Sequence, residues 1–145
     1  MTTVIKPMYP ANMQDFITLR ELAACLSGSF LPLAQQNKSV IINDIPEDLF
    51  IDTNTEVVAS ILGGLLSAVV KNAKESHISI SAKLYGNVVL VHVKDYNNIN
   101  YSLVENKLRS LQPLAEKIGG AVSVTSQRHN VTTFAFSFPN LPLAA

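Results

Sequence analysis

One stretch, residues 53–95, constrains the fold most, because a long apolar helix is followed there by two alternating strands. Apolar residues recur at helical spacing over residues 58–69. Thr53 and Glu56 fit a capping box, which predicts that Thr53 is the N-cap of this helix. Residues 77–93 alternate in polarity on both sides of a Gly-Asn turn, which predicts a β-hairpin. Together these patterns predict a helix that packs on an antiparallel pair of strands.

The central helix has almost no side chains along one side. Ser60, Gly64 and Ala68 follow one another at a spacing of four, with Gly63 and Ser67 beside them. Each interior glycine costs roughly 1 kcal/mol relative to alanine, so another group is expected to approach closely. We favour tight packing of the helix on a sheet over a role in facing a ligand.

The chain before this helix predicts one more helix and two short strands. Thr18 and Glu21 form a second capping box, and Pro32 is expected to kink or break the helix that begins there. Residues 39–43 and 49–51 are short apolar runs bounded by turn residues, which is typical of strands.

The chain after the hairpin predicts a third helix and a closing hairpin. Ser102 and Glu105 fit a third capping box, and Pro113 is expected to divide the helix. Two strands with a loop at residues 127–130 follow, and their inward rows are predicted to be Val122 and Val124, then Phe134, Phe136 and Phe138.

This order of elements predicts an α+β fold, a two-layer α/β sandwich with a mixed, largely antiparallel sheet and helices on one face. Residues 14–140 are expected to form the single domain. Residues 1–13 are expected to be an N-terminal arm and residues 141–145 a C-terminal tail.

Composition limits the classes of function. The chain has 145 residues, eleven basic and eleven acidic, without a basic cluster, so a nucleic-acid partner is not expected. No signal peptide is visible, and the uncharged run of residues 57–70 is too short to span a bilayer; we therefore expect a cytoplasmic protein without membrane insertion. Cys25 is the single cysteine, so an internal disulfide and a multi-cysteine metal site are excluded. The three histidines share no metal-binding spacing.

Several segments carry a resemblance to a known family. They are Pro32-Leu33-Ala34-Gln35-Gln36-Asn37-Lys38, Asn43-Asp44-Ile45-Pro46-Glu47-Asp48-Leu49, Gly64-Leu65-Leu66-Ser67-Ala68-Val69-Val70-Lys71, Gly119-Gly120-Ala121-Val122-Ser123-Val124 and Thr132-Thr133-Phe134. The ATP-binding catalytic domain of sensor histidine kinases, within the GHKL superfamily, has P-x-A-x-x-K, I-P-x-D-L, N-L-L-x-N-A-x-K, G-G-x-I-x-V and G-T-T-F at these places. The chain therefore resembles that domain over residues 19–139, and the resemblance implies its fold.

The nucleotide site that the resemblance implies departs from the family pattern. The family's magnesium-binding asparagine corresponds to Ala68, and the other asparagine of that motif corresponds to Gly64; neither supplies a side-chain oxygen, which a hard cation needs. The adenine-binding acidic residue corresponds to Asp95, which also fits a plain strand-end residue that caps the next turn. No glycine lies between Asp95 and Gly119, so the phosphate-covering lid is missing.

Residual ligand contacts are still expected at the other end of this site. Asp95 and Thr133 are predicted to line a shallow, adenine-sized notch, and Asn72 and Lys71 are the remaining candidates for a nucleotide contact. Asn72 would have to replace the missing metal ligand, although it lies one turn further along the helix. For Lys71 we keep open a plain role as a surface charge near the helix end.

The leading hypothesis is a degenerate, histidine-kinase-like pseudo-ATPase that acts through protein contacts in bacterial signal transduction or a phosphorelay. Under this hypothesis no catalytic residue, metal or cofactor is expected, and Ser60, Gly64 and Ala68 are predicted to offer a groove to a partner helix. The alternative is an enzyme: a divergent ATP- and Mg²⁺-dependent kinase or ATPase domain, or an anti-sigma-type regulator. Pairing of two copies as a homodimer through Phe30, the arm and the outer face of the first helix also stays open.

Overall fold

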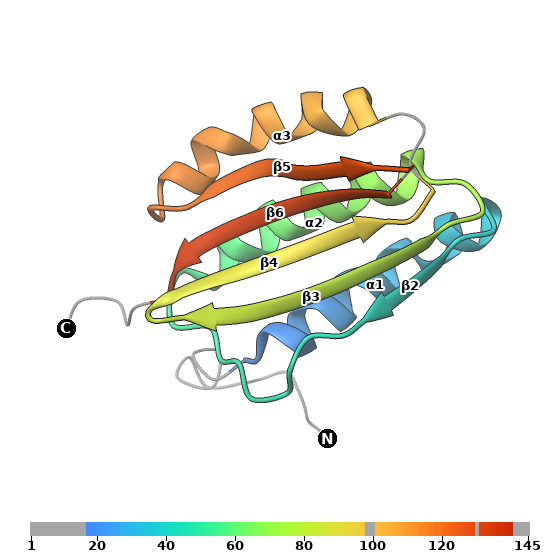
Figure 1. Cartoon of the computed structure of the whole chain (residues 1–145). Helices are drawn as coiled ribbons and strands as arrows, with labels where there is room; N and C mark the ends of the chain where they lie inside the picture. The colour runs from blue at the N-terminus through green and yellow to red at the C-terminus, as the bar shows by residue number, and fades with distance from the viewer. Residues whose placement is uncertain (1–16, 98–100, 130, 141–145) are drawn as a thin grey trace, which may run out of the picture.

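The computed structural model describes residues 17–97, 101–129 and 131–140 (Figure 1). The helices are α1 (Leu19–Gln36), α2 (Thr55–Asn72) and α3 (Tyr101–Glu116). The strands are β2 (Val40–Asn43), β3 (His77–Tyr85), β4 (Val88–Asp95), β5 (Ala121–Arg128) and β6 (Val131–Pro139). The predicted arm at residues 1–13 and the tail at residues 141–145 lie outside the described residues.

The strands form one sheet in the order β2-β3-β4-β6-β5, with the helices on one of its faces (Figure 1). β2 and β3 are parallel, and the other neighbouring strands are antiparallel. The parallel pair needs a crossover connection, and α2 supplies it. The predicted fold class, a mixed and mostly antiparallel sheet with helices on one side, is confirmed.

The core lies between the sheet and the helices. Val89, Val91 and Val93 of β4 are buried at every second position, as a strand with one covered face requires. Phe134, Phe136 and Phe138 form the matching row on β6 and are almost fully buried, which confirms the predicted inward row. The core row of α2 is longer: Val58, Ile61, Leu62, Leu65, Leu66, Val69 and Val70.

α2 is, among the described residues, the one helix long and apolar enough to cross a membrane by length and composition. Its apolar side chains, however, belong to the core between the sheet and the neighbouring helices. We therefore interpret α2 as the core helix of the domain.

The start of α1 has the predicted capping box. The Thr18 hydroxyl accepts a hydrogen bond from the Glu21 amide at 3.1 Å, and the Thr18 amide donates to the Glu21 carboxylate at 3.0 Å. The hydrogen bond from the Thr18 backbone amide lowers the pKa of Glu21, and the hydrogen bond from the Thr18 side chain lowers it by a smaller amount. The predicted break at Pro32 is wrong, because α1 runs through this residue to Gln36. Gly28, whose carbonyl loses its helical donor at Pro32, is exposed, so water can reach that carbonyl.

The starts of the other two helices differ from the prediction. Asn54, and not Thr53, is the N-cap of α2, and its side-chain oxygen accepts a hydrogen bond from the Val57 amide at 3.1 Å. Ser102 lies inside α3 and does not cap it, and Pro113 does not divide that helix. α3 continues through Pro113 to Glu116, although a proline inside a helix removes one backbone hydrogen bond.

Two loop predictions also need correction. Residues 49–51 form no strand: Phe50 makes an isolated bridge with Thr18, and this segment runs beside the start of α1. The predicted loop at residues 127–130 is shorter, because Gln127 and Arg128 still belong to β5. The chain therefore has one strand fewer before α2 than the sequence pattern predicts.

We predict that Asn54→Ala lowers the free energy of unfolding by about 1 kcal/mol, because the amide of Val57 loses its acceptor. Thr53→Ala is the matched control and should change stability much less. Urea denaturation of both variants measures the difference. A larger loss for Thr53→Ala would mean that α2 is capped as the sequence pattern predicted.

Candidate functional site

A polar cluster surrounds Asp95 at the end of β4. Asp95 is 0% exposed, and its carboxylate accepts a hydrogen bond from the Ser76 hydroxyl at 2.5 Å. The same oxygen accepts a hydrogen bond from the Asn97 amide at 3.1 Å. A buried carboxylate is tolerated where such donors replace water. Asp95 therefore caps the turn that follows β4, which is the plainer of the two interpretations that its sequence position allowed.

Thr132, and not Thr133, shares this cluster with Asp95. Thr132 lies directly opposite Asp95 in the register of β4 and β6, so both side chains point toward the helices. Thr133 is paired with Lys94, which places it on the other face of the sheet. The predicted notch between Asp95 and Thr133 is therefore wrong.

The Thr132 hydroxyl is buried, and no group among the described residues forms a hydrogen bond with it. Thr132 is not among the site residues predicted from the sequence, although its pattern contains the signal. Thr132 belongs to the same alternating row as Phe134 and Phe136, which was already predicted to face inward.

Asn72 and Lys71 lie at the last turn of α2. The Asn72 amide nitrogen donates to the backbone carbonyl of Ala68 at 2.8 Å, so this side chain folds back onto its own helix. Lys71 is exposed. The hydrogen bond of Asn72 gives it a local structural role, and its part in binding a nucleotide stays a prediction.

The small-residue side of α2 contacts the neighbouring helices. A Cβ atom on Gly64 would lie 2.9 Å from Leu111 Cδ2 of α3, and one on Gly63 would lie 3.4 Å from Leu26 Cδ2 of α1. The expected close approach exists, but at Gly63 and Gly64 it is made by helices α1 and α3, so the prediction that a sheet packs on this side is wrong there. The open groove predicted along Ser60, Gly64 and Ala68 is filled at Gly64, while Ser60 is exposed and Ala68 is buried. A role of Ser60 and Ala68 in partner binding stays a prediction.

The same positions do not fit a magnesium nucleotide of the kind that the family resemblance implies. Ala68 and Gly64 offer no side-chain oxygen, and Leu111 covers the helix at Gly64. Among the residues that the structure describes, no group of three or more His, Cys, Asp or Glu side chains could hold a metal ion.

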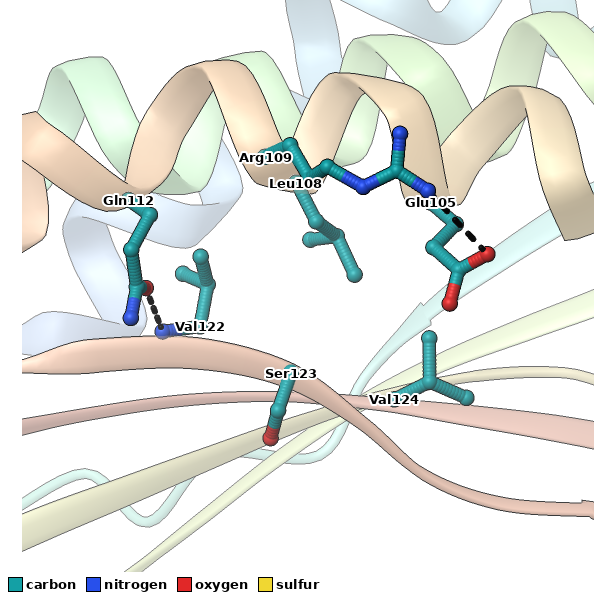
Figure 2. A pocket seen from close by; sticks show the side chains of 7 residues that line it. All are labelled: Glu105, Leu108, Arg109, Gln112, Val122, Ser123 and Val124. Atoms are coloured by element: carbon teal, nitrogen blue, oxygen red, sulfur yellow. Dashed lines mark hydrogen bonds and ion pairs between the residues drawn. The ribbon is translucent and has the colours of Figure 1, made fainter.

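A hollow of about 310 Å³ lies elsewhere, between α3 and β5 at the edge of the sheet (Figure 2). Its lining residues are Glu105, Leu108, Arg109, Gln112, Val122, Ser123 and Val124. The Gln112 side-chain oxygen accepts a hydrogen bond from the Val122 amide at 2.9 Å. Glu105 and Arg109 form an exposed ion pair at 3.9 Å. None of the residues singled out for a nucleotide lines this hollow.

A second hollow, of about 340 Å³, lies on the sheet face opposite the helices and includes His92 and Lys83. His92 is half-buried and points away from the row of Val91 and Val93, as its alternation predicted. Burial lowers the pKa of His92, and the positive charges of Lys94 and Lys83 lower it further. Below neutral pH this imidazole therefore stays uncharged over a wider range than an ordinary histidine does.

Comparison with solved structures places the fold among histidine kinases. The catalytic domain of histidine kinase ThkA in a nucleotide-free form matches with a TM-score of 0.67 and 18% identity, over 87% of this chain and 95% of that one. Histidine kinase AdeS of Acinetobacter baumannii matches with a TM-score of 0.72 and 11% identity, over 86% of this chain and 66% of that one. A histidine kinase of Burkholderia phymatum STM815 matches with a TM-score of 0.70 and 16% identity, over 86% and 70%.

These matches show that the chain has the fold of the histidine kinase catalytic domain, a GHKL-type ATPase fold, which confirms the resemblance at that level. The chain spans 66% of the AdeS chain, just under two thirds of its length. No protein-family model matches the sequence, and no curated protein matches it. At these identities the likeness concerns the fold alone.

We predict that Gly64→Leu destabilises the protein by about 1–3 kcal/mol, because the new side chain must displace Leu111. Ser60→Leu, one helical turn earlier at an exposed position, should have little effect. Thermal or urea unfolding compares the two variants. A Gly64→Leu variant as stable as the parent would contradict tight packing of α3 on Gly64. It would agree instead with an open groove on this side of α2.

Asp95→Ala should lower the free energy of unfolding by about 1–3 kcal/mol, because the Ser76 hydroxyl and the Asn97 amide lose their common acceptor. Asp44→Ala removes an exposed carboxylate and should stay within about 0.5 kcal/mol of the parent. Urea denaturation at neutral pH gives both values. Equal stability of the two variants would contradict the structural role of Asp95.

Proposed function

We propose that the chain is a histidine-kinase-like module that acts through protein–protein contacts in two-component signalling or a phosphorelay, without hydrolysing ATP. The observation that carries this proposal is the contact of Leu111 with α2 at Gly64. In the family pattern the asparagine motif of this helix serves the metal and the phosphates. Here the corresponding surface has lost its oxygen ligands and serves helix packing instead.

The state of Asp95 supports the same proposal. The Ser76 hydroxyl and the Asn97 amide, which donate to its carboxylate, belong to this chain and lie in the turns around β3 and β4. A nucleotide base would have to compete with them for a carboxylate that is 0% exposed. Binding would therefore require the turn after β4 to rearrange first, which lowers the apparent affinity by the fraction of chains in the open state.

A solved neighbour supports a proposal for the class of partner. Histidine kinase ThkA has been solved in complex with the response regulator protein TrrA, and its chain matches this one with 20% identity and a TM-score of 0.67. By this analogy we propose a signalling protein of a two-component system as the partner, in the cytoplasm. The match covers 41% of that ThkA chain, so the contacts of the whole kinase are not carried over to this chain.

The proposal is tested by titration with ATP and Mg²⁺, followed by calorimetry and by thermal shift. We expect no heat of binding and no shift up to millimolar nucleotide. A ligand present at 100 times its dissociation constant would stabilise the fold by about 2.7 kcal/mol, which is readily measured. A magnesium-dependent shift of that size would overturn the proposal.

A second candidate function, a divergent ATP-binding domain, is favoured by one observation. The Thr132 hydroxyl lies beside Asp95, is buried and has no hydrogen-bond partner among the described residues. Full-length ShkA, a neighbour of the same fold at 16% identity, has been solved with AMPPNP. Under this alternative, adenosine alone should stabilise the protein, and Thr132→Val should remove that stabilisation while Thr133→Val should not.

A further inference from the structure

The unpaired edge of β5 is the feature with the clearest unassigned role. β5 is the last strand in the sheet order, and among the described residues no strand lies on its outer side. The Val122 amide points away from β6, because it donates to Gln112 of α3. In an antiparallel strand, the N–H and C=O groups of one residue point to the same side of the strand. The N–H and C=O groups of the residue two positions further along point to that side too. The Val122 carbonyl and both backbone groups of Val124 therefore point outward as well.

The hollow beside this edge leaves room for another strand. α3 overhangs β5, and Gln112, Leu108 and Glu105 point down toward the strand in Figure 2. Val122 and Val124 point up toward α3, while Ser123 points to the opposite face of the sheet (Figure 2). A strand that added here would find backbone donors and acceptors along one side, and Leu108 with the polar side chains of Glu105 and Gln112 above.

The sequence of the edge fits a second copy of itself. Val122-Ser123-Val124 reads the same in both directions, so a two-fold axis through Ser123 places Val122 of one copy opposite Val124 of the other. Both members of each such pair have outward N–H and C=O groups, which is the condition for a hydrogen-bonded antiparallel pair. Ser123 then faces its own counterpart in the pair between them.

The charges and polar groups around the hollow also suit a second copy. Glu105 and Arg109 carry opposite charges 3.9 Å apart, so two such grooves meet without net charge. Glu105 lies near Val124, and Gln112 contacts Val122 (Figure 2). The two-fold axis therefore brings Glu105 of one copy toward Gln112 of the other, where the amide can donate to the carboxylate. On pairing, the Val122 amide would give up its hydrogen bond to Gln112 and donate instead to a backbone carbonyl of the second copy. The number of hydrogen bonds made by this amide would therefore stay the same.

We propose that two copies of the chain pair antiparallel through their β5 edges, centred on Ser123, and form one continuous sheet. This interface is separate from the outer face of α1 and does not depend on the proposed function. The occupant of the hollow between α3 and β5 is then the β5 edge of the second copy.

Introducing a charged side chain at Ser123 tests the proposal. The monomer should tolerate such a side chain, because Ser123 is exposed and points away from α3. Directly opposite side chains of like charge repel across a strand pair. Ser123→Lys and Ser123→Glu should each sediment as monomers, and their equimolar mixture should restore the dimer seen for the parent chain. Ser29→Lys on the outer face of α1 is the matched control and should remain dimeric.

A cysteine at the axis gives a second readout. In a Cys25→Ser background, Ser123→Cys should form an intermolecular disulfide under mild oxidation, because directly opposite Cα atoms of this pair lie about 4.5 Å apart. Ser137→Cys, on the inner neighbour β6, is the control and should cross-link far more slowly. A parent chain that sediments as a monomer at all concentrations overturns the proposal. So does a dimer that Ser29→Lys dissociates and Ser123→Lys does not.

Discussion

The contacts of α2 with its two neighbouring helices hold the rest of the structure in place. Adjacent glycines face different helices: Gly63 lies against Leu26 of α1, and Gly64 lies against Leu111 of α3. Two interior glycines cost roughly 1 kcal/mol each in helix propensity, and the packing of the buried Leu111 and the half-buried Leu26 against them offsets that cost. Because α2 also packs its apolar stripe on the sheet, it is fixed on three sides. Neither neighbouring helix can move far without exposing core surface.

This constraint affects differently the two places where the family resemblance implies nucleotide contacts. Where the resemblance implies the phosphates, Leu111 of α3 covers Gly64, so a phosphate bound there would require α3 to move and would find no side-chain oxygen at Gly64 or Ala68. At Asp95, where the resemblance implies a contact with the base, the Ser76 hydroxyl and the Asn97 amide of the chain itself donate to the carboxylate. A buried carboxylate must keep such partners whatever its function, since an unpaired one would be severely destabilising. A structural role is thus sufficient to account for a buried carboxylate at Asp95.

The sequence predicts those parts of this structure that depend on periodicity. The stripe of α2 and the alternating rows of β3, β4 and β6 follow from burial of one face, and with the ordered motifs they were enough to identify the fold. Local choices were less predictable. Thr53 and Asn54 are adjacent and both cap helices well, so the pattern could not decide between them. Pro32 and Pro113 are tolerated inside helices because packing outweighs the loss of one hydrogen bond. The cover over Gly64 depends on the path of α3, which no local pattern records.

The two edges of the sheet show why pairing through β5 would stop at two copies. An unpaired edge that accepted strands without limit would lead to open-ended association, which folded proteins avoid. Here the register of β5 shifts between Val124 and Ser126, so the regular stretch of outward backbone groups is short. A pairing about a two-fold axis uses the same stretch on both copies and leaves no free β5 edge. The remaining edge, β2, has only four residues, and Asn43 at its end donates a side-chain hydrogen bond to the Arg20 carbonyl. The geometry that permits one copy to add at β5 therefore also prevents a third from joining there.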